Sequence, residues 1–307
     1  IRKLLKIRGK ITSLSKLKLY EEELANLERE ITLFQAEAAL KTLEISKSKV
    51  DLIGFHGQTI FHDPENKITK QLGDGKLLSQ LTKKKVVYDF RQNDLKNGGQ
   101  GAPLTPIFHN VMANKISKKF DLKFPIDILN IGGIANITTT VSEKDLWNVK
   151  DLNAYDIGPG NCLIDEWIRK NSVKKYDNEG FLAKSGEIDK LILSQALDNF
   201  NLGYDYKKSL DIKDFDIFFA KGLSLENGAS TITDFTAKLI ADGMKYAEDT
   251  INLKKSKWLV CGGGRKNKYL LESIKHNFEK INLHPIDKYK IDGDFIESQA
   301  FAFLAIR

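Results

Sequence analysis

One carboxylate in this chain stands beside a turn of small residues. In residues 154–167 (AYDIGPGNCLIDEW), Asp156 precedes two glycines that flank a proline, which predicts a strand end, a sharp turn and then a helix. The side-chain oxygen of Asn161 is suited to cap that helix. An acid at a strand end, near a helix N-terminus that attracts anions, can act as a general base or position a metal ion. The alternative is a structural aspartate in an ordinary strand-to-helix turn.

Two further glycine-rich turns are candidates for cradling a nucleotide. Residues 129–136 (LNIGGIAN) predict a β-hairpin, and residues 260–267 (VCGGGRKN) predict a strand, a turn and a helix. Small residues at a turn let backbone N–H groups approach phosphate oxygens closely. Neither segment matches the Walker or the dinucleotide fingerprint. A purely structural turn therefore explains each segment as well when it is taken alone.

The composition narrows the class of protein. The chain has 307 residues, enough for two lobes with a buried core, and no apolar run approaches the roughly 20 residues of a membrane span. Its formal net charge is +7, but only 7 of its 48 basic residues are arginine and its lysines are spread along the chain. This pattern disfavours nucleic-acid binding. Cys162 and Cys261 lie far apart without metal-ligand spacing, which favours a reducing cytoplasm.

Hydrophobic periodicity predicts the elements of the first third. Residues 1–18 are basic and show no pattern, and a long helix is predicted from Tyr20, where apolar residues recur at steps of four and three. The apolar positions are Tyr20, Leu24, Leu27, Ile31, Phe34 and Ala38. Residues 50–61 predict an apolar strand ending in a glycine turn. Residues 86–90 predict a short strand, followed by a long glycine-rich loop of the kind that is usually functional.

The remainder predicts a sheet covered by helices. A second unit begins at Pro125 with a hairpin over residues 126–140, and the strand and helix around Asp156 follow. The later elements are a mainly helical stretch over residues 184–255, a strand over 258–261 and helices over 268–278 and 297–307. In such an α/β order, ligands bind at the carboxyl ends of the strands.

Six motifs together resemble one family, the bacterial anhydro-N-acetylmuramic acid kinases. They are GFHGQTIFHDP, VVYDFRQNDLKNGGQGAPLTP, LNIGGIANIT, YDIGPGNCLIDEW, VCGGGRKN and DGDFIESQAFAFLA, in the family's order from Gly54 to Ala305. The resemblance covers about residue 24 to the end. It implies the two-lobed α/β ATPase fold of actin, sugar kinases and heat-shock ATPases, with mixed sheets covered by helices. The N-terminal lobe would span residues 1–124 and the C-terminal lobe residues 125–307.

The resemblance also implies a reaction. Water opens the 1,6-anhydro bridge of anhydro-N-acetylmuramic acid while the 6-oxygen takes the γ-phosphate of ATP, as part of cell-wall recycling. Asp156 would be the base for water. Mg²⁺ would arrive with ATP, held mostly by phosphates and waters, so no metal ligands are assigned in the chain. The residues assigned to ATP are Gly132, Gly133, Asn136, Gly158, Gly160, Asn161, Gly262, Gly263, Gly264 and Asn267.

A second group of residues would contact the sugar. Arg91 offers a bidentate fork for a carboxylate or phosphate, and Asp94 lies beside it in the sequence. His56 and Gln58 would hydrogen-bond hydroxyls or the acetamido group, and Glu297 would be a second carboxylate on the sugar. The alternatives are an Arg–Asp structural pair, a structural histidine, and a helix-capping or surface glutamate.

One part of the family pattern has no counterpart in the chain. The hairpin that grips the ATP phosphates at the start of the family is not found, so we expect an incomplete N-terminal lobe and weak activity of this chain alone. The alternative function is a truncated or degenerate, non-catalytic protein that binds a nucleotide or muropeptide. A different sugar kinase of the same fold is a further alternative. No nucleic-acid or membrane partner is expected, and assembly into a homodimer stays open.

Overall fold

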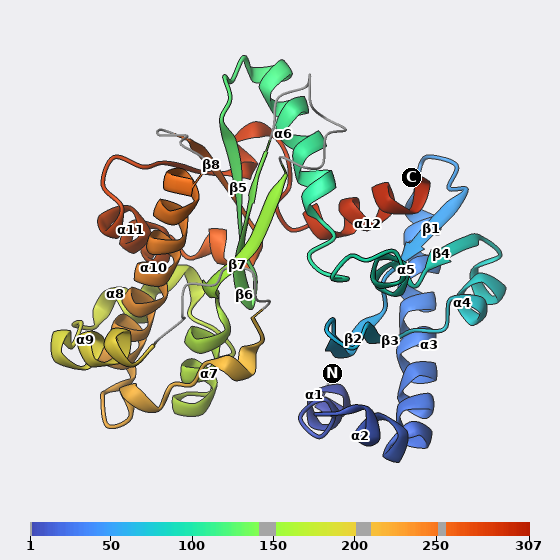
Figure 1. The fold of residues 1–307 in the computed structure, drawn as a ribbon, viewed down its shortest axis with the longest axis horizontal. Coiled ribbons are helices and arrows are strands. Elements are labelled where there is room, and N and C mark those ends of the chain that lie inside the picture. The colour runs from blue at the N-terminus through green and yellow to red at the C-terminus, as the bar shows by residue number, and fades with distance from the viewer. Residues whose placement is uncertain (1, 141–151, 201–209, 251–255) are drawn as a thin grey trace. The chain divides into compact units, whose positions relative to one another are not determined.

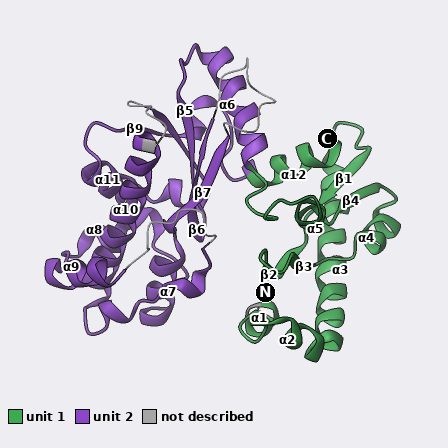
Figure 2. Ribbon diagram, in the orientation of Figure 1, with its two compact units in different colours: residues 1–105, 297–307 green, residues 106–296 purple. Residues whose placement is uncertain are grey.

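The computed structural model describes residues 2–140, 152–200, 210–250 and 256–307 (Figure 1). The chain divides into two compact units, coloured separately in Figure 2. Unit 1 contains residues 1–105 and 297–307, and unit 2 contains residues 106–296. The units divide between Thr105 and Pro106, whereas the predicted lobe boundary between residues 124 and 125 stays a prediction.

Unit 1 is mainly helical, with two small sheets. A parallel pair joins β1 (Leu52–Phe55) to β4 (Lys85–Tyr88), and an antiparallel pair joins β2 (Gln58–Asp63) to β3 (Ile68–Leu72). Its helices are α1 (Arg2–Arg8), α2 (Leu14–Leu19), α3 (Glu21–Ile45), α4 (Gly75–Thr82), α5 (Phe90–Lys96) and α12 (Ile296–Ile306), of which α12 starts at the last residue of unit 2.

The start of unit 1 differs from the sequence prediction. Residues 1–18, which showed no pattern, contain α1 and α2, because Ile7 and Ile11 are buried in a cluster with Leu24 and Leu27 of α3. The side chain of Ser13 caps α2 by accepting from Lys16 N at 3.4 Å. Two isolated apolar residues thus anchor a segment too basic to show a periodic stripe.

The long helix predicted from Tyr20 is confirmed as α3, but its buried face shifts in its second half. Phe34 is 69% exposed, and Thr32 is buried instead. The hydroxyl of Thr32 accepts a hydrogen bond from the backbone N–H of Asp74 at 3.0 Å, immediately before α4. Packing against α4 therefore replaces the expected apolar contact.

The described part of unit 2 contains a five-stranded mixed sheet in the order β7-β6-β5-β8-β9. The strands are β5 (Ile126–Ile131), β6 (Ile134–Thr139), β7 (Asn153–Pro159), β8 (Lys257–Cys261) and β9 (Asn282–Pro285). β5 and β6 form the predicted hairpin, and β5, β8 and β9 run parallel. Since β6 is antiparallel to both β5 and β7, the carboxyl ends of β5, β7 and β8 lie at the same edge.

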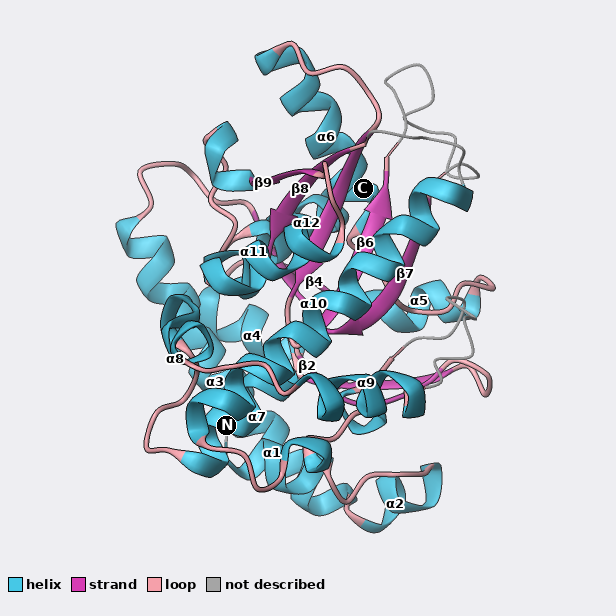
Figure 3. Ribbon diagram, turned by 90° about the vertical axis from the view of Figure 1, so that its left-hand side faces the viewer, coloured by secondary structure: helices cyan, strands magenta, loops and turns pink. Residues whose placement is uncertain are grey.

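Helices cover both faces of this sheet, as Figure 3 shows for α10 and α11 on one side. The α-helices in the described part of unit 2 are α6 (Pro106–Phe120), α7 (Cys162–Asn171), α8 (Phe181–Ser185), α9 (Lys190–Asn199), α10 (Leu225–Thr250) and α11 (Lys268–Asn277), of which α8 and α9 pack against α10. Alternate residues of β5 face opposite layers: Leu129 and Ile131 join the cluster of α7, α10 and α11, whereas Ile126 and Ile128 pack with α6. The α/β class with a mixed sheet is thus as predicted.

Candidate functional site

The three glycine turns of unit 2 meet at the carboxyl edge of its sheet. The backbone N–H of Gly160 donates to the carbonyl of Gly133 at 2.9 Å, and that of Asn161 donates to the carbonyl of Gly132 at 2.8 Å. A Cβ placed on Gly263 would have the side-chain nitrogen of Asn161 as its nearest neighbour, at 3.7 Å. Segments that lie more than a hundred residues apart in the sequence therefore form one corner.

Some of these glycines are needed for packing. A Cβ on Gly160 would overlap the carbonyl oxygen of Gly132, and one on Gly264 would overlap the side chain of Ile131. Gly262 has φ +78°, and its Cβ would lie 2.6 Å from the carbonyl oxygen of Ile131. These glycines bring the turns close to β5, which is a structural reason for their type.

Other glycines of the same corner leave room. A Cβ on Gly132 would lie 3.5 Å from the carbonyl oxygen of Ile134, and one on Gly133 would lie 3.6 Å from Cδ1 of Ile212. Gly263 has 3.7 Å, as above, and both Gly133 and Gly263 are exposed. The absent side chains keep this backbone open to a ligand, as a phosphate or ribose cradle requires.

Asp156 lies inside β7, and not at the strand end that the sequence predicted. Ala135 pairs with Gly158 and Asn136 pairs with Asp156, so Ile157 is an extra residue that makes a β-bulge. Bulges redirect side chains and are frequent next to active sites. Asn136, assigned to ATP from the sequence, therefore lies directly opposite Asp156 across the ladder.

The environment of Asp156 makes its carboxylate a stronger base. Burial raises its pKa, and a hydrogen bond from the backbone N–H of Leu210 to Oδ2 at 2.9 Å opposes this effect. The other oxygen, Oδ1, has no hydrogen bond recorded among the described residues. This carboxylate is thus held in place at one oxygen and is suited to accept a proton at the other.

Two asparagines of the corner make structural hydrogen bonds, and only the predicted capping role of Asn161 is wrong. Asn161 begins α7 without a capping hydrogen bond, because its side-chain nitrogen donates instead to the carbonyl of Gly132 at 3.2 Å. Asn267 is buried and caps α11 by accepting from Leu270 N at 2.9 Å. An ATP contact by Asn267 stays a prediction, but its side-chain oxygen already has a structural partner.

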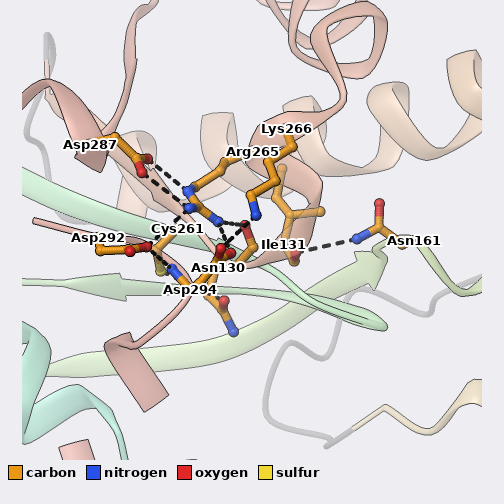
Figure 4. A network of polar contacts seen from close by, with 10 residues as sticks. Asn130, Ile131, Asn161, Cys261, Arg265, Lys266, Asp287, Asp292 and Asp294 are labelled. Atoms are coloured by element: carbon orange, nitrogen blue, oxygen red, sulfur yellow. Dashed lines mark hydrogen bonds and ion pairs between the residues drawn. The ribbon is translucent and has the colours of Figure 1, made fainter. Parts of the chain in front are cut away.

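Arg265, which was not among the predicted site residues, follows the glycine turn in the 3₁₀ segment η6 (Gly263–Lys266). Its buried guanidinium donates to the carbonyl of Gly262 at 3.0 Å and forms ion pairs with aspartates of a later loop (Figure 4). The signal available in the sequence was an arginine directly after GGG in a chain that has few arginines, with the acidic segment DGD downstream.

Unit 1 brings together another group of predicted residues. Arg91 lies on α5, within the segment predicted to be a loop. Its Nε donates to Nε2 of His56 at 2.7 Å, and its Nη1 donates to the carbonyl of Gly101 at 2.9 Å. The ring of His56 packs on Phe301 of α12 with 4.4 Å between ring centroids. Burial, with the charge of Arg91, lowers the pKa of His56 to about 4, so this imidazole is neutral.

Asp94 and Glu297 complete this group in different ways. Asp94 accepts from the backbone N–H of Gly101 at 2.8 Å and so holds the glycine-rich loop; no ion pair with Arg91 is recorded among the described residues. Glu297, in the first turn of α12, is exposed. Burial lowers the pKa of Arg91, and the nearby charge of Glu297 opposes this effect. Gln58 is exposed at the start of β2. Asp94 thus shapes the loop, and its predicted contact with the sugar stays a prediction.

The described residues lack two features, a metal-binding cluster and a membrane-spanning helix. Across residues 2–140, 152–200, 210–250 and 256–307, no cluster of three or more His, Cys, Asp or Glu side chains is arranged to hold a metal ion. Within the same ranges, no helix has the length and apolarity that crossing a bilayer requires. The predicted site residues lie in the corner of unit 2 and in the Arg91 group of unit 1.

Comparison with known proteins gives a consistent result. The model of the anhydro-N-acetylmuramic acid kinase family matches residues 5–307, and so begins before the first motif at Gly54. The protein of that name from Pelagibacter ubique (strain HTCC1062) is 52% identical over 308 residues, covering 99% of this chain and 80% of the relative. Its namesakes from Rhodospirillum rubrum and Zymomonas mobilis are 40% and 36% identical, over 93% and 94% of this chain and 72% and 75% of their own lengths.

Proposed function

Because the chain belongs to the anhydro-N-acetylmuramic acid kinase family, we propose that it opens the 1,6-anhydro ring of anhydro-N-acetylmuramic acid with water and phosphorylates the 6-oxygen from ATP. The product is N-acetylmuramic acid 6-phosphate, in peptidoglycan recycling. Identity of 52% over 99% of this chain favours a catalytic member over a degenerate one. The observation that carries the proposal is the corner of unit 2, where three glycine turns meet near the bulged strand of Asp156.

In this reaction Asp156 takes the proton of the water that attacks the anomeric carbon. Burial raises its pKa and therefore its basicity, and the hydrogen bond from Leu210 fixes the orientation of its carboxylate. Asn136, the cross-strand neighbour of Asp156, would contact ATP beside this base.

The open backbone of the corner fits a nucleotide. Gly132, Gly133 and Gly263 would contact ATP, since no side chain stands between their backbone and a phosphate or ribose. When bound, Mg²⁺ neutralises charge on the transferring phosphoryl group, and it is held chiefly by phosphates and waters.

The Arg91 group of unit 1 fits the sugar. A neutral His56, oriented by Arg91, offers hydrogen bonds without adding charge, and the guanidinium and Glu297 supply opposite charges nearby. The carboxylate of the lactyl group is the part of the substrate that a guanidinium binds best. Gln58 is exposed and available to a hydroxyl.

We further propose that the two units correspond to the lobes of the ATPase fold shared by actin and sugar kinases. The sheet order β7-β6-β5-β8-β9, with a hairpin beside parallel strands, supports this. A cytoplasmic location is proposed with it, because Cys162 and Cys261 are both buried thiols.

The substitution Asp156→Asn tests the assignment of the base. It should lower kcat by about 10²–10⁴-fold and leave the affinity for a non-hydrolysable ATP analogue within about twofold. Phosphorylation of anhydro-N-acetylmuramic acid is measured beside calorimetric titration of the analogue. Catalysis requires ionised Asp156, whose pKa is raised. On acidification, wild-type kcat should therefore begin to fall at a higher pH than the titration of an ordinary aspartate, about 3.9, would give.

Asp234→Asn is the matched control. Burial also raises the pKa of Asp234, which lies on α10 and accepts a hydrogen bond from Asn277. This variant should keep wild-type turnover. Turnover by Asp156→Asn at the wild-type rate would refute the base assignment, and wild-type preference for glucose or N-acetylglucosamine would refute the substrate.

A further inference from the structure

Arg265 gathers three aspartates around one buried guanidinium (Figure 4). Its side chain is 4% exposed. Nε lies 2.7 Å from Oδ2 of Asp287, Nη1 lies 2.7 Å from Oδ1 of Asp294, and Nη2 lies 3.5 Å from Oδ1 of Asp292. A second bond, from Nη2 to Oδ1 of Asp287 at 3.1 Å, makes that pair bidentate. This planar fork is specific to arginine.

The contacts of this cluster shift the pKa values of Arg265, Asp287 and Asp294 in favour of their charged forms. The hydrogen bonds to Asp287 and Asp294 raise the pKa of Arg265, and hydrogen bonding to Arg265 and Lys266 lowers the pKa of Asp294 to about 2. The partner carboxylates are 44–57% exposed, so the aspartates reach into solvent while the cation is buried. The cluster is therefore a fixed tether and not a pH-sensitive one.

The tether acts directly on the glycine turn. Nη1 of Arg265 donates to the carbonyl of Gly262, the residue held at φ +78°. On the other side, Gly293 packs so closely that a Cβ there would overlap the guanidinium. The turn with the open Gly263 is thus joined to the loop of Asp287–Asp294 by the buried Arg265, and the exposed Lys266 adds an ion pair with Asp294.

We propose that Arg265 is a positioning residue for the nucleotide: it fixes the turn of Gly262 and Gly263 in the conformation that receives ATP. This inference rests on the proposed function, because it assigns the ligand of the turn. Arg265 acts through the backbone of Gly262 and touches no reacting atom. The expected effect is therefore on nucleotide affinity rather than on the chemical step.

The substitution Arg265→Lys tests the inference, because it keeps the charge and removes the fork. The dissociation constant of a non-hydrolysable ATP analogue with Mg²⁺ should rise about tenfold or more, while KM for the sugar and kcat at saturating ATP change by less than about threefold. Arg169→Lys is the matched control, since Arg169 pairs with Asp165 on α7 in a half-exposed i,i+4 contact. That variant should bind the analogue as the wild type does.

Two aspartate variants separate positioning from simple stabilisation. Asp287→Asn breaks the bidentate pair and should weaken analogue binding more than Asp292→Asn, whose oxygen lies 3.5 Å away. Unchanged analogue affinity in folded Arg265→Lys would overturn the inference; if that variant fails to fold, unchanged affinity in folded Asp287→Asn would do so. Wild-type chain that binds the analogue without phosphorylating the sugar would refute the proposed function alone, and wild-type chain that binds no analogue would overturn both.

Discussion

His56 is held as a neutral acceptor by its neighbour. Because Arg91 always carries its proton, its Nε–H can only donate, so Nε2 of His56 accepts and Nδ1 donates to the carbonyl of Gly57 at 2.9 Å. The tautomer follows from these two hydrogen bonds. A second cation next to Arg91 would be unfavourable, which agrees with the lowered pKa of His56.

This arrangement predicts sugar binding that does not titrate with histidine. With the pKa of His56 at about 4, the affinity for anhydro-N-acetylmuramic acid should vary by less than about twofold between roughly pH 5.5 and 8, whereas an ordinary histidine would titrate near about 6.5. Calorimetry across this range provides the measurement. An inflection near pH 6.5 that disappears in His56→Gln would contradict the neutral assignment.

At the scale of elements, some glycines in the turns of unit 2 are required for close packing, whereas others leave room for a side chain. A Cβ on Gly160 would overlap the carbonyl of Gly132, whereas one on Gly133 would only make an ordinary contact with Cδ1 of Ile212 at 3.6 Å. Both would be read as equivalent ligand-binding glycines from the sequence. In the structure their surroundings differ, so alanine should have different effects at the two positions.

We therefore expect opposite outcomes for two alanine variants. Gly160→Ala should reduce the free energy of unfolding by about 1–3 kcal/mol, because its Cβ overlaps backbone that cannot move alone. Gly133→Ala should leave stability within about 0.5 kcal/mol and instead weaken binding of the ATP analogue. Urea unfolding and calorimetry measure the two effects. Equal stability of both variants would show that the turn relaxes around Gly160.

Local patterns predicted most elements of unit 2 but fewer of unit 1. The hairpin of β5 and β6 and the strand β8 follow from short β-rich runs bounded by glycines. α5 was missed because it is short and polar, with Leu95 as its one fully buried residue among those described. Asn161 looked like a cap, but its amide is taken by a carbonyl of another strand, a contact that no local pattern reveals.

The candidate site could likewise be predicted only in part from the sequence. The glycine turns and Asp156 were found because their types are unusual at those spacings. Arg265 was not found, since its partners Asp287 and Asp294 lie 22 and 29 residues further along the chain. The bulge at Ile157 also depends on strand pairing, which composition cannot indicate.

At the scale of the molecule, β5, the central strand of the sheet in unit 2, contains a buried acid, Asp127. Burial raises the pKa of Asp127 to about 7, and the charge of Glu248 adds to this effect, whereas hydrogen bonds from Ser256 and from the backbone N–H of Thr140 oppose it. The unfolded chain releases this proton near pH 3.9. Between about pH 4 and 7 the folded state therefore binds more protons, and the free energy of unfolding falls as pH rises.

Asp127→Asn should remove this contribution. The difference in the free energy of unfolding, variant minus wild type, should therefore increase by about 1–4 kcal/mol when the pH is raised from 5 to 8. Urea unfolding of both proteins at the two pH values measures the difference, in which the contributions of other groups cancel. Parallel pH profiles for the two proteins would show that Asp127 is ionised throughout.

Unit 1 is assembled from both ends of the described chain, with residues 297–307 returning to residues 1–105. Gly54 of β1 packs against the backbone of Phe301, whose ring also covers His56. During synthesis on the ribosome, β1 therefore cannot pack against α12 until all of unit 2 has been translated. Unit 2 is contiguous and can close its core first. Until α12 has been made, a nascent chain therefore leaves this side of β1 uncovered, which exposes it to aggregation.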